Sequence, residues 1–248
     1  MPEAPAADRL TGAMLLRPSA MSDDARPRPR PLMRRYEAVY LDESGQVAEV
    51  NRIAPATPFF EEAFSALARG ALVATPQGPV AVEDLLPGDR VDTAESGPEV
   101  LLWKGSLTLY PQRRDVSGRP DRLLRMTADA LGFQRPMQDL LLGPGAMIWS
   151  SRIGAFVAAT DLVDGDTVLE LTPVAPVAAF HLCLSGGRTL LVNGVALRSY
   201  APDVREAAAL PSDLLALFLA LFPNEALLPE LDTPRRGDLR LKGGIAAA

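Results

Sequence analysis

The chain has 248 residues, of which 48% are hydrophobic and 23% are charged, as in an ordinary globular protein that buries a sizeable core. The net charge of −6 and the isoelectric point near 5.0 argue against a nucleic-acid-binding protein, which needs a basic surface. The only cysteine is Cys183 and the only histidine is His181, so neither an internal disulfide nor a multi-cysteine metal site can form. We therefore expect no metal and no cofactor.

The first 34 residues are predicted to form a disordered arm rich in proline and arginine. Prolines alternate with arginines over positions 26–31, which favours an extended, polyproline-like backbone. The basic stretch that begins at Arg26 and ends at Arg35 offers a docking site for an acidic protein or an anionic lipid. A solvated tail without a partner is the favoured interpretation, because the arm is short and the whole chain is acidic.

Neither a targeting segment nor a membrane span is expected. The longest apolar run near the N-terminus covers residues 13–16, which is too short for a signal peptide. No stretch reaches the roughly 18 apolar residues of a spanning helix. We expect a cytoplasmic protein that does not contact membranes, while secretion through an uncleaved C-terminal signal stays open.

A hairpin and a helix are predicted next, over residues 35–69. Residues 36–41 and 46–53 flank an Asp-Glu-Ser-Gly turn and predict the two strands. Residues 57–69 predict a short amphipathic helix, with Thr57 as N-cap, proline at the first helical position and Gly70 beyond the end.

Residues 70–202 are predicted to form a body of short strands. The sequence GALVATPQGPVAVEDLLPGDRV, residues 70–91, alternates apolar strand segments with Pro-Gln-Gly and Pro-Gly-Asp turns. The pair Asn193-Gly194 between two apolar runs predicts a two-residue hairpin. Residues 112–122 are polar and predict a loop. Turn residues separate the further predicted strands, at residues 97–103, 123–127, 140–142, 147–149, 156–159, 167–171, 178–184 and 189–197.

Residues 203–248 predict a helical appendage followed by a tail. Residues 211–222 have a capping residue, Ser212, and a continuous apolar run from Leu214 to Phe222. A helix that is apolar on all sides is normally buried, so we expect it to pack on the β body or on a second copy. The alternative is a helix that binds a partner protein or dips into a membrane.

Several segments in this order resemble the bacterial Hint-domain proteins of the hedgehog/intein superfamily. Besides residues 70–91, the resemblance rests on VLLWKG, ADALG, DLLLGP, LVDGDTV, FHL and VNG, which lie at residues 100–105, 128–132, 139–144, 162–168, 180–182 and 192–194. It covers about residues 64–202. The resemblance implies a mainly β, Hint-like fold of short twisted strands and hairpins. The short preceding helix and the C-terminal helix predicted above complete the expected fold.

The family's reaction is an acyl shift, and the resemblance places its groups in this chain. A Cys or Ser attacks the preceding carbonyl, and a Ser/Thr-x-x-His element polarises that carbonyl and protonates the leaving nitrogen. The nucleophile position is Ala66, and the second element reads Gly143-Pro144-Gly145-Ala146. Ser65 is adjacent to the nucleophile position but is one residue out of register. On a regular helix, its side chain would point about 100° away.

The remaining candidates for chemistry are few. His181 and Cys183 are two residues apart on one strand and would share a face, but about 6–7 Å is too far for a hydrogen bond. We interpret them as packed core residues. Asn193 invites comparison with the terminal asparagine of inteins, yet a hairpin turn explains Asn193-Gly194 fully. The acidic turn residues lack the spacing of a calcium loop; they are Asp84, Asp89, Asp164 and Asp166.

Our main hypothesis is a catalytically degenerate Hint-domain protein, retained as a structural or interaction module. The alternative is a self-processing protein that uses Ser65 or another displaced nucleophile. A third possibility is a membrane-peripheral protein that uses the basic arm and the apolar C-terminal helix.

Overall fold

The computed structural model describes residues 32–111, 120–202 and 204–224. Residues 1–31 of the arm predicted for residues 1–34, most of the loop predicted at 112–122, and the tail beyond residue 224 lie outside the described residues. Among the described residues, no helix is long and apolar enough to cross a membrane.

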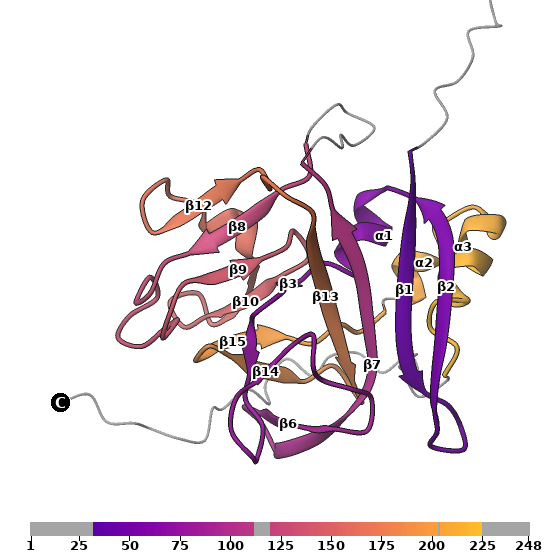
Figure 1. Ribbon diagram of the computed structural model, residues 1–248, viewed down its shortest axis with the longest axis horizontal. Helices are drawn as coiled ribbons and strands as arrows, with labels where there is room; N and C mark the ends of the chain where they lie inside the picture. The colour runs from indigo at the N-terminus through magenta and orange to yellow at the C-terminus, as the bar shows by residue number, and fades with distance from the viewer. Residues whose placement is uncertain (1–31, 112–119, 203, 225–248) are drawn as a thin grey trace, which may run out of the picture. The chain divides into compact units, whose positions relative to one another are not determined.

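The fold is mainly β (Figure 1). Its elements, in chain order, are β1 (Met33–Leu41), β2 (Val47–Pro55), α1 (Pro58–Glu62), β3 (Leu67–Ala68), β4 (Leu72–Val73), β5 (Val80–Ala81), β6 (Arg90–Thr93), β7 (Gly97–Leu109), β8 (Leu123–Met126), β9 (Leu140–Leu142), β10 (Met147–Ser150), β11 (Ala155–Ala158), the 3₁₀ turn η1 (Ala159–Leu162), β12 (Val168–Leu171), β13 (Val177–Leu184), β14 (Thr189–Val192), β15 (Val195–Arg198), α2 (Val204–Ala207) and α3 (Ser212–Leu219).

Strand β7 joins the two parts of the sheet. Its first residues pair with β6, and its later residues pair with β13 on one side and β1 on the other. The main path of the sheet runs β11-β10-β15-β14-β6-β7-β13-β3-β9-β8-β12. The strands predicted from the body are all present, but β7 continues to Leu109, six residues beyond its predicted end, while the other ends differ by one or two residues. Asn193 and Gly194 form the predicted two-residue turn between β14 and β15.

The N-terminal hairpin is confirmed, but it begins earlier than predicted. Strand β1 starts at Met33, so Arg34 and Arg35 belong to the sheet rather than to the arm. Arg34 is 3% exposed and lies on the inward face of β1 with Tyr36 and Ala38. The basic docking arm therefore cannot include Arg34.

The helix predicted for residues 57–69 is wrong in its length. It begins at Pro58 after Thr57, as predicted, but ends at Glu62 with Ala63 as its C-cap. The chain then extends into β3, which pairs with β13 and with β9. Two hydrophobic cores explain the break, because Phe60 and Phe64 pack in one and Leu67 packs in the other.

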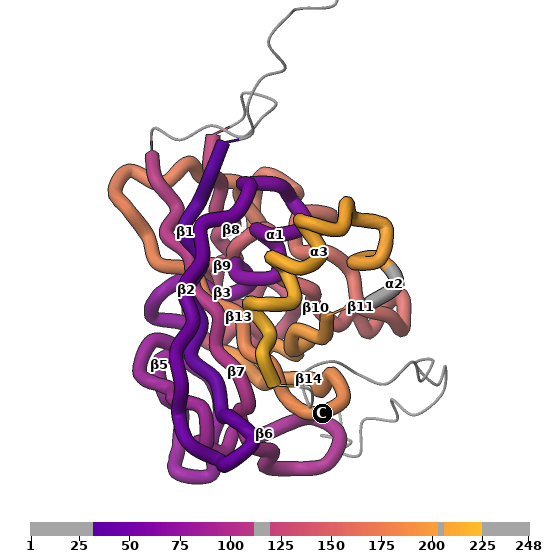
Figure 2. The backbone as a smooth tube through the Cα atoms, turned by 90° about the vertical axis from the view of Figure 1, so that its right-hand side faces the viewer, coloured from indigo at the N-terminus to yellow at the C-terminus, as the bar shows by residue number. Residues whose placement is uncertain are grey.

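The C-terminal helix α3 packs on its own chain, beside β2 (Figures 1 and 2). Its N-cap is Pro211 and not the predicted Ser212. Phe218 and Phe222 are buried, and the ring of Phe222 stacks on Trp103 at a centroid distance of 4.7 Å. Trp103 Nε1 donates a hydrogen bond of 2.9 Å to the Leu221 carbonyl. The predicted packing of the apolar run on the body is confirmed. The buried side chains Phe218 and Phe222 contact other parts of the same chain.

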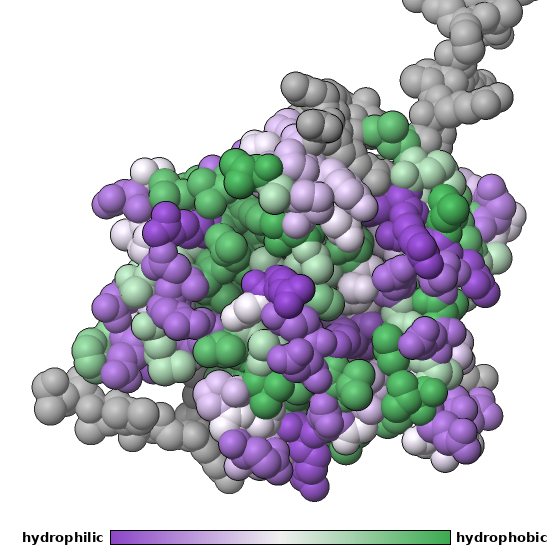
Figure 3. All heavy atoms as spheres, viewed as in Figure 1, coloured by the Kyte–Doolittle hydropathy of each residue, from purple (hydrophilic) through white to green (hydrophobic). Residues whose placement is uncertain are grey.

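The surface of the view in Figure 1 carries both kinds of side chain. Hydrophobic residues gather over β8, β9 and β12, while hydrophilic and hydrophobic residues are mixed over the rest of that face (Figure 3). The most exposed large apolar side chains are Phe133 and Val174, which are 85% and 97% exposed.

Candidate functional site

The peptide bond between Ser65 and Ala66 is held from two sides by backbone hydrogen bonds. On one side, the Ala66 amide donates to the Phe180 carbonyl of β13 at 2.9 Å. On the other side, Gly143 donates to the Ala66 carbonyl and Gly145 donates to the Ser65 carbonyl, both at 3.0 Å. Both polar groups of this peptide are therefore satisfied by the backbone, in the link between the end of α1 at Glu62 and the start of β3 at Leu67.

The loop that faces this peptide has no room for side chains at two positions. A β-carbon added at Gly143 would lie 2.0 Å from the Ser65 carbonyl oxygen. A β-carbon at Gly145 would lie 2.1 Å from the Glu62 carbonyl oxygen. Real β-carbons do not come that close to backbone oxygens, so glycine is required at both positions. The Ser65 carbonyl therefore fills the space that a Ser or Thr side chain at position 143 would need.

The two alanines at the remaining positions are buried. Ala66 is 2% exposed and Ala146 is 0% exposed. Both belong to the same hydrophobic core cluster. Neither side chain carries an atom that can attack a carbonyl or donate a proton.

Ser65 is fully buried, and its hydroxyl is engaged. Its Oγ donates a 2.6 Å hydrogen bond to the Glu61 carbonyl, one helical turn earlier. A peptide carbonyl cannot take the proton from a serine hydroxyl, so this partner does not activate Ser65 as a nucleophile.

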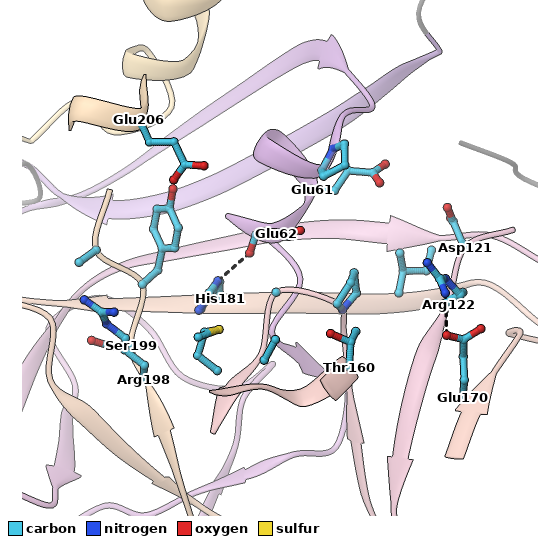
Figure 4. Close-up of a pocket in the computed structure, with 18 of the residues that line it drawn as sticks. Glu61, Glu62, Asp121, Arg122, Thr160, Glu170, His181, Arg198, Ser199 and Glu206 are labelled. Carbon is cyan, nitrogen blue, oxygen red and sulfur yellow. Dashed lines mark hydrogen bonds and ion pairs between the residues drawn. The ribbon is translucent and has the colours of Figure 1, made fainter. Parts of the chain in front are cut away.

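His181 lies on β13 beside the same segment. It is 4% exposed, and its Nδ1 is 3.0 Å from the Glu62 carbonyl, which requires the proton on Nδ1 (Figure 4). Burial lowers the pKa of the imidazole from 6.5 to about 4. Hydrogen bonds with backbone groups of Glu62, Arg198 and Ala63 oppose that shift. At neutral pH, the ring is therefore neutral and acts as a donor to the backbone.

Cys183 does not form a reactive pair with His181. The thiol is 1% exposed and belongs to the core that contains Trp103. Burial raises the pKa of the Cys183 thiol to about 12, so it stays protonated. Its Sγ contacts the Leu184 carbonyl at 3.7 Å. The interpretation of these two residues as packed core groups agrees with this geometry.

Asn193 is placed away from this peptide, in the turn between β14 and β15. Its φ of +48° lies in the left-handed region that a two-residue hairpin turn uses. Its Oδ1 accepts a 2.7 Å hydrogen bond from the Leu72 amide. The side chain thus ties the turn to β4. The described residues, the acidic turn residues among them, contain no group of three His, Cys, Asp or Glu side chains that could hold a metal ion.

A groove of about 690 Å³ opens beside the Ser65–Ala66 segment (Figure 4). Gly145 and His181 are among the residues that line it. Five carboxylates and two guanidinium groups also line it, from Glu61, Glu62, Asp121, Glu170, Glu206, Arg122 and Arg198.

An arginine behind the groove wall holds two of these carboxylates. Arg34 Nε lies 2.8 Å from Glu61 and its Nη2 lies 2.7 Å from Asp121. Arg122 and Glu170 form an ion pair of 2.6 Å at the same end. Sequence reasoning missed the groove, because its residues come from α1, α2 and several strands that are far apart in the chain.

Comparison with known families decides the assignment. The family model described as "Hint domain" matches residues 65–204, which is more than half of the chain. The chain belongs to the Hint-domain family. The match begins at Ser65, so it includes the Ser65–Ala66 peptide, the facing loop and the groove residue His181.

Solved structures of similar Hint-type domains are distant in sequence. A bacterial intein-like domain from Clostridium thermocellum is 16% identical, and the alignment covers 55% of this chain and 99% of that chain, with a TM-score of 0.42. The gp41-1 intein is 12% identical, with 55% and 98% coverage and a TM-score of 0.38. No curated protein matches the chain.

Proposed function

We propose that this chain is a non-catalytic Hint-domain protein that acts as a structural or interaction module. The observation that carries the proposal is the closed environment of the Ser65–Ala66 peptide. Alanine stands at the nucleophile position, and the backbone of Gly143 is packed onto the carbonyl that would be attacked.

The groups that an acyl shift needs are each accounted for by another role. The leaving nitrogen would be that of Ala66, and its proton already bonds to the Phe180 carbonyl. His181 is neutral at pH 7 and directs its Nδ1 to the Glu62 carbonyl, so it does not supply an acid to that nitrogen. The N–H and C=O groups of the Ser65–Ala66 peptide both have ordinary backbone hydrogen bonds.

The self-processing alternative would use Ser65 on the preceding carbonyl, that of Phe64. This reaction needs a base for the serine proton. The hydroxyl instead donates to the Glu61 carbonyl in a fully buried position. The proposal therefore assigns Ser65 to the connection between α1 and β3.

Intact-mass measurement tests the proposed function directly. The purified full chain is incubated for days with and without dithiothreitol or hydroxylamine, alongside Ser65→Ala as a matched control. We expect one full-length mass in all samples. Fragments that end at Phe64 or Ser65 and disappear in Ser65→Ala would overturn the proposal in favour of self-processing.

A second variant tests the reason for inactivity. Ala66→Cys restores a nucleophile with a small increase in volume, and we expect no thiol-dependent cleavage because the facing loop lacks an acid. Thiol-dependent fragments from this variant would show that the site lacks only its nucleophile. The wider restoration that the family resemblance suggests, with Gly143→Thr and Ala146→His, is unsuitable because a β-carbon at position 143 collides with the Ser65 carbonyl.

A further inference from the structure

Strand β2 forms an open edge of the sheet. Among the described residues it pairs with β1 alone, while β1 continues into the sheet through β7. Its nine residues make it longer than the other strands with a single neighbour, β5, β11 and β12, which have two to four residues. Figure 2 shows α3 to one side of β2 without crossing it. The free edge of β2 is therefore open to another strand.

Alternate residues of β2 direct their backbone groups away from β1. In an antiparallel pair, residues that exchange hydrogen bonds alternate with residues whose N–H and C=O groups face outward. The Ala56 amide bonds to the Leu32 carbonyl at 2.7 Å, in the same register as the ladder, so the even-numbered residues of β2 bond to β1. The outward N–H groups then have no hydrogen bond in the part of the chain that the structure describes; they belong to Val47, Glu49, Asn51 and Ile53.

This edge has few of the features that keep sheet edges from pairing. Lysines, internal prolines and β-bulges usually protect such strands. Strand β2 has no lysine, its register with β1 is unbroken over nine pairs, and its only proline, Pro55, is its last residue. One contact runs along the edge, because Arg52 Nη1 donates a 2.8 Å hydrogen bond to the Asn51 carbonyl. That carbonyl keeps a second lone pair for another donor.

Two exposed apolar side chains mark the outer face of β2. Val47 is 52% exposed and Ile53 is 64% exposed. They lie three residues on either side of Val50, so a two-fold axis at Val50 places each of them opposite the other in an antiparallel copy of β2. Apolar side chains that face each other across two strands stabilise a sheet, and the symmetry supplies this pair twice.

The same axis also satisfies the backbone and avoids charge repulsion. With this axis, Glu49 lies opposite Asn51 of the second copy, and every outward amide faces a carbonyl. An axis at Glu49 or at Arg52 instead sets like charges opposite each other, which is destabilising. An axis at Asn51 sets Val47 opposite Pro55, which has no N–H to return. Of these four axes, the first is the one without a mismatch.

We propose that β2 pairs with β2 of a second copy of this chain, antiparallel and with the two-fold axis at Val50. A second copy is the occupant because β2 itself meets the hydrogen-bonding, apolar and charge requirements of this edge. The inference goes beyond the proposed function, since β2 precedes the residues that match the Hint family model, which begin at residue 65. One pair of strands makes a smaller contact than the roughly 1,200–2,000 Å² of stable interfaces, so we expect a weak dimer.

Sedimentation equilibrium of the full chain tests the proposal. Between about 1 µM and about 1 mM, we expect the mass to rise from 26.5 kDa towards twice that value. A constant mass of 26.5 kDa over this range would overturn the proposal, and it would leave the edge free for a strand of a different protein.

Two isoleucines of similar exposure provide a matched pair of variants. Ile53→Lys removes both apolar pairs of the interface and should raise the dissociation constant at least about tenfold. Ile153, in the turn between β10 and β11, is 58% exposed, and Ile153→Lys should leave the dissociation constant unchanged. Urea unfolding verifies that both variants stay folded. Equal effects of the two variants on association would overturn the assignment to β2.

Asn51→Lys tests the register. The introduced lysine would lie opposite Glu49 of the second copy at two symmetric places, so we expect the dissociation constant to fall about threefold or more at low salt. With the axis at Asn51, the two introduced lysines would face each other and the dissociation constant would rise. An unchanged or higher dissociation constant would therefore overturn the proposed register.

Intact mass separates a failure of this proposal from a failure of the proposed function. A chain that stays monomeric and shows one full-length mass overturns the dimer alone. Cleavage fragments overturn the proposed function, whatever the sedimentation result.

Discussion

Gly143 lies against Ser65 so closely that a β-carbon at position 143 would sit 2.0 Å from the Ser65 carbonyl oxygen. We expect Gly143→Ala to lower the free energy of unfolding by about 3 kcal/mol or more. Either the loop or the buried Ser65–Ala66 peptide, which makes two backbone hydrogen bonds, must move to admit the β-carbon. Urea unfolding monitored by tryptophan fluorescence measures the change.

Gly70→Ala is the control for the substitution itself. Gly70 has a φ of +88° but no atom within 4 Å of the added β-carbon. Its cost should be confined to backbone strain of about 1–2 kcal/mol. A loss at Gly143 that is no larger than the loss at Gly70 would contradict the close packing of the loop on Ser65.

The packing around this peptide shows what sequence reasoning could reach. The strands were predictable because turn residues and alternating apolar residues are local signals. The extent of the helix after Thr57 was not, since Phe60, Phe64 and Leu67 fit a helical period equally well. The helix ends at Glu62 because of contacts that are remote in the sequence: Leu67 pairs with Phe180, more than a hundred positions away, and packs in a different core from Phe60 and Phe64.

The Hint-family positions were identified from the sequence, but their surroundings were not. The residue types at Ala66, Gly143 and Ala146 show that reactive atoms are missing. They do not show that the backbone has closed over the Ser65 carbonyl, because that contact joins segments nearly eighty residues apart. The same limit hides the groove, whose carboxylates meet only in the folded chain.

Arg34 provides a second prediction, because it is a buried cation with two acidic partners. Its side chain is 2% exposed and bonds to Glu61, to the buried Asp121 and to the Thr108 carbonyl. Arg34→Met leaves the Asp121 carboxylate without its counter-charge. We expect a loss of about 3–5 kcal/mol in the free energy of unfolding.

The neighbouring arginine is a matched control for this charge removal. Arg35 pairs with Glu37 on the outer face of β1, and their side chains are 62% and 52% exposed. Arg35→Met should cost less than about 1 kcal/mol in the same urea experiment. Equal losses for the two variants would show that Arg34 is not the buried hub that the structure describes.

Phe222→Ala tests whether the C-terminal segment contributes to the stability of the fold. It is 1% exposed and its ring lies against Trp103 and Tyr200. Phe222→Ala should lower the free energy of unfolding by about 3–5 kcal/mol through lost burial and a cavity. Phe133→Ala, at a phenylalanine that is 85% exposed, should change stability by less than about 0.5 kcal/mol. Similar small effects at both sites would mean that the segment is only loosely attached.

His181 predicts a dependence of stability on pH. Burial lowers its pKa from 6.5 in the unfolded chain to about 4 in the folded one, so the unfolded chain binds the extra proton between these values. The contribution of His181 to the free energy of unfolding is therefore fully present above pH 6.5, and it is lost as the pH falls from 6.5 to about 4. The total loss is about 3 kcal/mol, at about 1.4 kcal/mol per pKa unit, and about 2 kcal/mol of it is reached at pH 5.

Two measurements check this prediction. His181→Gln should lose about 2 kcal/mol less than the parent chain between pH 7 and pH 5 in urea unfolding, whatever its stability at pH 7. Because the chain has one histidine, the ring Hε1 resonance can also be followed by NMR without assignment of neighbours. We expect it to stay at its neutral position down to pH 5. A midpoint near 6.5 would show that the ring is solvated, and it would also remove the reason for treating His181 as a neutral donor to the Glu62 carbonyl.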